Sequence, residues 1–200
     1  MKSLLIKDLI SIRAQARGIL LVLALWLGIS LVNGSGSFFA ALSTVYVIML
    51  PLTAISADEN SRYERYALTM PISRTALALS RYVLGVLCGL GLAALGFAVC
   101  VALGEGVHAS AVNCSAFFFL GLLFLSLLLP LAYKYGVEKA RLGMVGFFVA
   151  VFLVFGYIFE WLGIDPAQLR AAAVLLPLLS AAAMAVSAAV SVGIYRRREF

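Results

Sequence analysis

The chain has 200 residues, of which 64% are hydrophobic and only 12% charged, and its mean hydropathy is +1.09. This composition excludes a soluble globular protein, which needs more polar surface, and it predicts a polytopic membrane protein. The net charge of +6 does not indicate nucleic-acid binding, because the basic residues stand beside apolar segments, where they orient membrane spans. No room remains for a separate soluble domain, so we expect residues 1–200 to form a single transmembrane domain.

Residues 1–17 are too polar to cross a membrane. Their apolar side chains recur at helical spacing, whereas the Lys and Arg residues occupy other positions. This pattern predicts an amphipathic helix in the membrane interface, with a frayed basic tail as the alternative. No A-x-A cleavage site closes the apolar run that follows, so we expect an uncleaved first span.

Six apolar segments approach the length of about 20 residues that crosses a bilayer. The predicted spans are residues 18–33, 38–57, 82–103, 112–133, 142–162 and 171–195. The predicted connections include a turn at 33–37, an outer loop at 104–111 and a basic connection at 134–141. With the N-terminus in the cytoplasm, 14 of the 15 Lys and Arg residues are cytoplasmic, and Arg170 is the exception. Because this bias sets orientation, we expect an all-α protein with six transmembrane helices and both termini cytoplasmic.

Segment 58–81, between the second and third spans, concentrates the charge. Its charged residues are Asp58, Glu59, Arg62, Glu64, Arg65, Arg74 and Arg81. The run from Ser56 to Glu59 fits an S-x-x-E capping box, which predicts the start of a helix. Pro71 should end this helix, and Ser73 should cap a second helix that leads into the third span.

The first of these two helices is amphipathic. Tyr63, Tyr66, Ala67 and Met70 share one face, and Asp58 can pair with Arg62 one turn later. A helix lying on lipid usually carries mostly Lys and Arg on its polar face, whereas this one mixes acids and bases. Mixed charge with tyrosines favours docking into a protein groove over an interfacial helix.

The chain resembles the ABC-2 type permeases, in particular the small six-span subunits of bacterial ABC exporters. The element from Tyr66 to Arg74, after an acidic stretch, and the Arg81-Tyr82 pair entering the third span carry the resemblance. It implies a multi-pass protein of the bacterial plasma membrane and two permease copies, either identical (a homodimer) or homologous (a heterodimer). It also implies a coupling helix at 58–70 in a cleft of a separate ATPase. The implied ATPase-coupling residues are Asp58, Glu59, Arg62, Tyr63, Glu64, Arg65, Tyr66, Pro71 and Arg74. The segment between the fifth and sixth spans is briefer here than in that family.

This chain shows no nucleotide-binding signature of its own. No G-x-x-x-x-G-K-[ST] motif occurs, and none of its lysines follows a glycine. We therefore expect no enzyme activity and no cofactor in this chain, with ATP and Mg²⁺ bound by the partner ATPase. His108, with Glu105 alone nearby, makes a poor metal site.

Two other functions remain open. One is a six-span substrate-binding subunit of a vitamin-type importer. Such subunits carry stripes of small residues on the first span, whereas this chain carries bulky residues there. The other is a secondary transporter, which should show an ionisable residue at membrane depth. The cargo of an exporter is open among an amphipathic peptide, a lipid and a drug.

Small and polar residues within the spans suggest helix contacts. Gly85, Gly89 and Ala93 form a small-residue face on the third span, which packs against another helix of this chain or of a second copy. We expect Ser43, Thr44 and Tyr46 to form helix–helix hydrogen bonds, with a place facing a pathway as the alternative. Cysteines 88, 100 and 114 show no C-x-x-C spacing, so we expect buried small hydrophobes, with a contact between the last two as the alternative.

Overall fold

The computed structural model describes residues 2–61, 74–143, 145–146, 149 and 175–197. These residues are almost all α-helical and include no strand, as predicted. The helices are α1 (Lys2–Asn33), α2 (Gly36–Ser61), α4 (Arg74–Ala102), α5 (Val107–Tyr135) and α8 (Leu176–Arg197), and residues 137–143 are also helical.

Four helices contain stretches long and apolar enough to cross a membrane, and they match four of the predicted spans. The stretches are Gly36–Glu59, Thr75–Ala102, Val107–Tyr135 and Leu176–Ile194. The predicted first span falls in a shorter apolar stretch, Arg17–Asn33. The predicted fifth span lies almost wholly outside the described residues, so the total of six spans stays a prediction.

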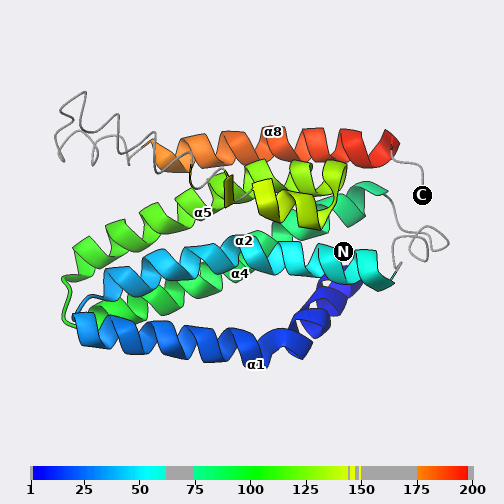
Figure 1. The fold of residues 1–200 in the computed structure, drawn as a ribbon. Helices are drawn as coiled ribbons and strands as arrows, with labels where there is room; N and C mark the ends of the chain where they lie inside the picture. The colour runs from blue at the N-terminus through cyan, green and yellow to red at the C-terminus, as the bar shows by residue number, and fades with distance from the viewer. Residues whose placement is uncertain (1, 62–73, 144, 147–148, 150–174, 198–200) are drawn as a thin grey trace.

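Helix α1 joins two segments that the sequence suggested were distinct. The predicted interfacial helix and the first span form one continuous helix, Lys2–Asn33, whose N-terminal part bends away from the direction of the rest (Figure 1). The predicted turn follows at once. Gly34 has φ of 64°, a left-handed conformation that suits glycine, and its N–H donates to the Leu31 carbonyl over 3.3 Å.

Two predicted connections are shorter than expected. Helix α5 begins at Val107, so the outer loop predicted at 104–111 is replaced by a tight turn over residues 103–106. The connection predicted at 134–141 is a single reversal at Gly136, with φ of 85°, after which residues 137–143 resume a helix. Hydropathy underestimates the length of these helices, because polar residues at the ends of a span do not stop the hydrogen bonding of the backbone.

The capping-box prediction is wrong. Residues 56–59 lie inside α2, which runs without interruption to Ser61, so no helix begins there. The S-x-x-E pattern marks a start only where its first residue leaves the helical conformation, and the apolar turns before Ser56 keep the chain helical instead. Asp58 and Glu59 therefore stand on the last turns of a long helix.

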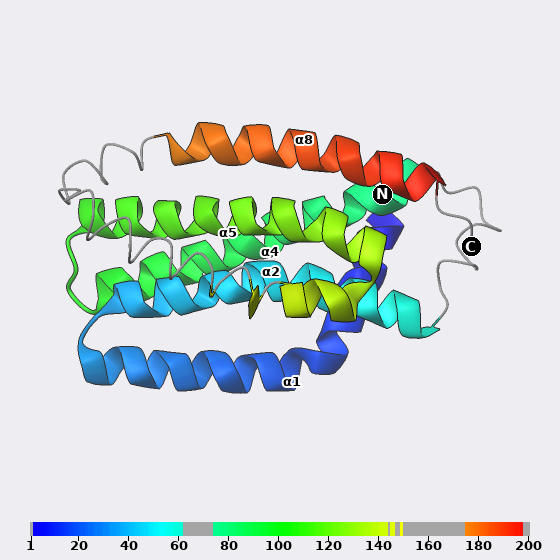
Figure 2. The same cartoon turned by 45° about the horizontal axis from the view of Figure 1, so that its top comes forward.

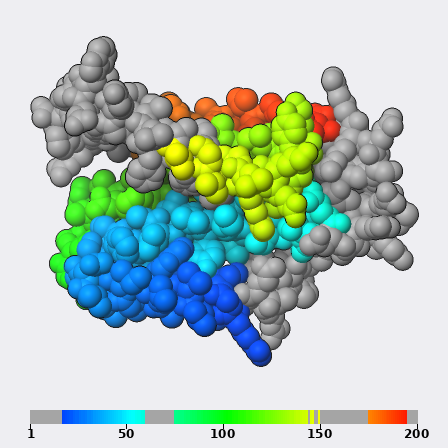
Figure 3. Space-filling view, viewed as in Figure 1, coloured from blue at the N-terminus to red at the C-terminus, as the bar shows by residue number. Residues whose placement is uncertain are grey.

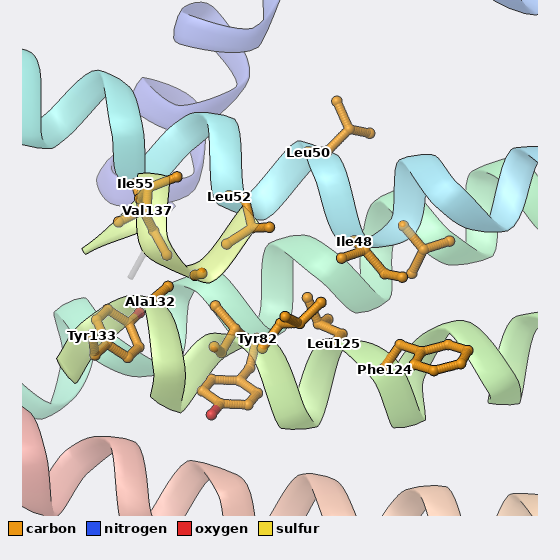
Figure 4. Close-up of a cluster of buried hydrophobic side chains, with 14 of the residues drawn as sticks. Ile48, Leu50, Leu52, Ile55, Tyr82, Phe124, Leu125, Ala132, Tyr133 and Val137 are labelled. Carbon is orange, nitrogen blue, oxygen red and sulfur yellow. The ribbon is translucent and has the colours of Figure 1, made fainter. Parts of the chain in front are cut away.

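The helices pack as layered, roughly aligned rods. Helix α2 contacts α4 and α5, α8 covers α5 and α4, and α1 lies on α2 (Figures 1 and 2). The main core joins α2, α4, α5 and residues 137–143. Figure 4 shows part of it, including Ile48, Leu52, Leu125 and Val137. We call the end where α2 finishes and α4 begins the loop end. The start of α1 and the end of α8 lie there too, and the opposite end is the turn end (Figures 1 and 2).

Glycines allow this close packing. A Cβ on Gly85 would lie 2.3 Å from Leu125 Cδ2, and one on Gly89 would lie 2.9 Å from Phe118 Cε2. Both glycines of the predicted small-residue face thus lie against α5 of the same chain. Ala93 and Gly89 line a cavity. The volume of this cavity, about 10 Å³, is at the lower limit for a single water molecule.

Candidate functional site

The loop end carries a buried ion pair close to the end of α2 and the start of α4, the two helices that flank residues 62–73 in the sequence. Arg81 Nη2 of α4 contacts Asp58 Oδ2 of α2, and the two side chains are only 4% and 9% exposed. Removing one partner of such a pair leaves a charge in a poorly solvated place, which is costly. The pair therefore links the helix that precedes residues 62–73 to the helix that follows them.

The next residue of α2 reaches the helix at 137–143. Glu59 Oε2 accepts a hydrogen bond from the backbone N–H of Val137 over 3.4 Å. A helix N-terminus has unsatisfied N–H groups and a partial positive charge, so a carboxylate is favourable there. Val137 also packs in the core with Ile55 of α2 (Figure 4), and this segment, yellow in Figure 3, lies beside the α2 surface.

The residue after Arg81 ties α4 to the other side of the bundle. The Tyr82 hydroxyl lies 2.7 Å from both the Ser187 and the Ser191 hydroxyl oxygens of α8. Ser187 Oγ also donates to the Ser126 carbonyl of α5. All of these side chains are buried, so they satisfy one another away from water. Arg81 connects α4 with α2, Tyr82 connects α4 with α8, and Ser187 connects α8 with α5. We call this set of contacts the junction.

Sequence reasoning singled out Arg81, Tyr82 and Asp58, but it did not pair Asp58 with Arg81, and it missed the serines that contact Tyr82. The serines of α8 left a signal, since Ser180, Ser187 and Ser191 fall on one helical face of an otherwise apolar segment, and all three are buried. The Asp58–Arg81 contact joins residues 23 apart in sequence, and no local pattern shows such a pairing.

The predicted ATPase-coupling residues divide into two groups. Asp58 is buried and Glu59 is half-buried, and both make contacts within the chain. Arg74 is the first residue of α4. The remaining residues lie outside the described part of the chain, as do the predicted Ser73 cap and the second member of the predicted Asp58–Arg62 pair. They are Arg62, Tyr63, Glu64, Arg65, Tyr66 and Pro71.

A second polar cluster holds the turn end together. Glu105 accepts hydrogen bonds from the N–H groups of Gly36 (2.7 Å) and Ser37 (3.1 Å) and from the Ser37 hydroxyl (2.9 Å). Asn113 Nδ2 donates to the same hydroxyl oxygen over 3.2 Å. Glu105 thus caps the first turn of α2 from the α4–α5 connection. The sequence had suggested it only as a poor metal ligand with His108.

The pKa of Glu105 reports this capping. Burial raises the pKa of the carboxyl, but the hydrogen bonds from Ser37 and Gly36 favour the carboxylate and bring the pKa below its ordinary value. Because the folded pKa lies below the unfolded one, the carboxylate stabilises the fold at neutral pH. This stabilisation is lost as the pH falls from the unfolded pKa, about 4.3, through the folded one.

We expect Glu105→Gln to lower stability at pH 7 by about 1 kcal/mol, because the amide supplies one acceptor in place of a charged pair of oxygens. Melting of the purified protein in detergent between pH 7 and pH 3.5 measures this effect. The difference between parent and variant should shrink on acidification. Glu138→Gln, at an exposed carboxylate, should follow the parent throughout. A constant difference across this pH range would contradict the capping role.

A model of the ABC-2 family transporter proteins matches residues 3–196, which is nearly the whole chain. No curated protein matches the chain.

Proposed function

The chain belongs to the ABC-2 family of transporter proteins, and from this premise we propose that it is the membrane permease of an exporter driven by a separate ATPase. A permease of this kind is the membrane-embedded subunit of a transporter and not itself an enzyme. ATP and Mg²⁺ would be bound by the partner. We include an amphipathic peptide in the proposal as the first cargo class to test.

The junction is the observation that carries the proposal. Residues 62–73 connect the end of α2 with the start of α4, and the buried Asp58–Arg81 pair holds these helices together close to that connection. A partner that displaced residues 62–73 would move α2 and α4 as a unit. Tyr82 would pass the displacement to α8 through Ser187 and Ser191. This is a suitable arrangement for shifting a bundle between two packed states.

The proposal includes an orientation. The start of α1 and the end of α8 lie at the loop end, the same end of the bundle at which α2 finishes (Figure 1). In the sequence, 14 of the 15 Lys and Arg residues belong to segments that share one side of a six-span topology. We therefore propose that the loop end and both termini are cytoplasmic, in a bacterial plasma membrane. A second permease copy would complete the pathway.

Family membership favours this function over the two alternatives. A secondary transporter uses no ATPase, and a vitamin-type substrate-binding subunit needs no coupling segment. The buried ionisable pair in the described residues lies near the end of the apolar stretch of α2 and joins two helices. Its place therefore fits a structural tie better than a proton relay at membrane depth.

A double charge reversal tests the docking of residues 58–70. The variant Glu64→Arg with Arg65→Glu keeps the net charge and the membrane spans, but it reverses the local charge pattern. We expect the tagged variant to reach the membrane at the parent level and to lose the co-purifying ATPase, with a loss of tenfold or more. Cargo-stimulated ATP hydrolysis in reconstituted vesicles should fall with it.

The matched control reverses a neighbouring pair. Glu138 and Lys139 are adjacent and exposed, and they follow the reversal at Gly136 at the loop end. Glu138→Lys with Lys139→Glu should retain the ATPase. Retention by the Glu64/Arg65 variant, or equal loss in both variants, would show that docking does not depend on the pattern in residues 58–70.

A further inference from the structure

Two cysteines meet at the turn end of the bundle. Cys100 lies near the end of α4 and Cys114 near the start of α5, and their sulfur atoms are 3.8 Å apart. Both are buried, with exposures of 0% and 5%. They form a small core with Ala40, and Phe97 and Phe117 pack against it. The burial expected from the sequence therefore holds for Cys100 and Cys114 but not fully for Cys88, which is half-buried, and the alternative, a contact between Cys100 and Cys114, is present.

The surrounding backbone holds the two thiols in place. Only residues 103–106 separate α4 from α5, so the two helices form a tight hairpin whose cysteines flank the turn. A Cβ on Gly36 of α2 would lie 2.4 Å from Cys100 Cα, which shows how closely α2 covers the pair. A disulfide has a sulfur–sulfur bond of about 2.05 Å, so the two sulfurs, now 3.8 Å apart, would move toward each other when the bond forms.

We propose that Cys100 and Cys114 form an intrachain disulfide that staples the α4–α5 hairpin at the turn end. The inference rests on the orientation proposed above, which places this end on the extracytoplasmic side, where disulfides form and persist. It does not depend on the ATPase or on the cargo. The α4–α5 hairpin is a local unit of the chain, and its two cysteines are only 14 residues apart in sequence.

The oxidant is a protein disulfide of an extracytoplasmic thiol–disulfide exchange protein. One cysteine thiolate attacks this disulfide, forms a mixed disulfide and releases one oxidant thiol. The second cysteine thiolate then attacks the mixed disulfide, forms the intrachain bond and releases the other oxidant thiol. The two cysteines give up two electrons and two protons, and the oxidant disulfide is reduced to two thiols.

The staple would hold the outer end while the loop end moves. Its sulfurs lie beneath the first turn of α2, which Glu105 caps from the same α4–α5 connection. Oxidation therefore joins α4 to α5 at the end farthest from the junction. Burial in an apolar core then protects the bond from soluble reductants.

Thiol counting in membranes tests the proposal. In a Cys88→Ser chain, only the two paired cysteines remain. Membranes are treated with N-ethylmaleimide in denaturant, then reduced, and the new thiols are labelled with a polyethylene-glycol maleimide. We expect a two-label mass shift after reduction and none when the reductant is omitted. Absence of the shift after reduction, or a disulfide-linked dimer on a non-reducing gel, would overturn the proposal.

Two further variants keep the outcome decisive. Adding Cys100→Ser to the Cys88→Ser chain leaves Cys114 alone, and this chain should give no label after reduction. The exposed position of His108 reports the orientation separately. A His108→Cys variant without other cysteines should react in intact cells with a membrane-impermeant maleimide. If the His108→Cys variant reacts but the disulfide is absent, the staple alone is overturned. If this variant does not react, the proposed orientation is overturned together with the staple that rests on it.

Discussion

Replacing Arg81 with alanine is expected to lower the free energy of unfolding by about 3–5 kcal/mol. The substitution leaves the Asp58 carboxylate buried without the guanidinium that it contacts, and the two side chains are almost wholly inaccessible. It also loosens α4 from α2 at the loop end. The quantity to measure is the unfolding transition of the purified protein in detergent, followed by heat or by a denaturing detergent.

A double variant separates the lost charge partner from lost packing. Asp58→Asn combined with Arg81→Ala removes both charges of the pair, so it should be more stable than Arg81→Ala alone. Lys139→Ala, at an exposed position, should be within about 0.5 kcal/mol of the parent. If the Arg81→Ala variant were as stable as the Lys139→Ala variant, the ion pair would not stabilise the junction.

The spans were predictable because the signal for them is local. Hydropathy and length belong to consecutive residues, so the predicted ranges 38–57, 82–103, 112–133 and 171–195 each fall largely within one helix. The helix ends were harder to predict. Helices α2 and α5 continue past their apolar parts to Ser61 and Tyr135, because a helix continues through polar residues until the backbone turns, as it does at Gly136.

The junction was predictable only in part. Arg81 and Tyr82 stood out because the resemblance to the ABC-2 type permeases includes a basic residue and a tyrosine that enter the third span. Asp58 was interpreted as a helix-start residue, and its contact with Arg81 depends on how α2 and α4 cross, which tertiary packing decides. Glu105 was missed for the same reason, since the α2 turn that it caps is about 70 residues away in sequence.

Replacing Gly36 with alanine is the second change with a large expected effect, a loss of about 1–3 kcal/mol or more. The new Cβ would lie 2.4 Å from Cys100 Cα and 2.8 Å from Cys100 N. These are backbone atoms of α4, so no side-chain rotation can relieve the clash, and α2 must move away from α4. The Gly36 N–H would still be present, but that movement would carry it away from Glu105, 2.7 Å from it in the parent.

The matched control has the opposite expected sign. Gly91 lies within α4, and a Cβ there would meet nothing within 4 Å, so Gly91→Ala should leave stability unchanged or raise it by up to about 1 kcal/mol through helix propensity. The same chemical change thus separates close helix contact from propensity, and unfolding in detergent measures both variants. Equal stability of the two would mean that α2 does not approach α4 at Cys100. The capped turn at Glu105, where α2 begins against the end of α4, would then lose its structural basis.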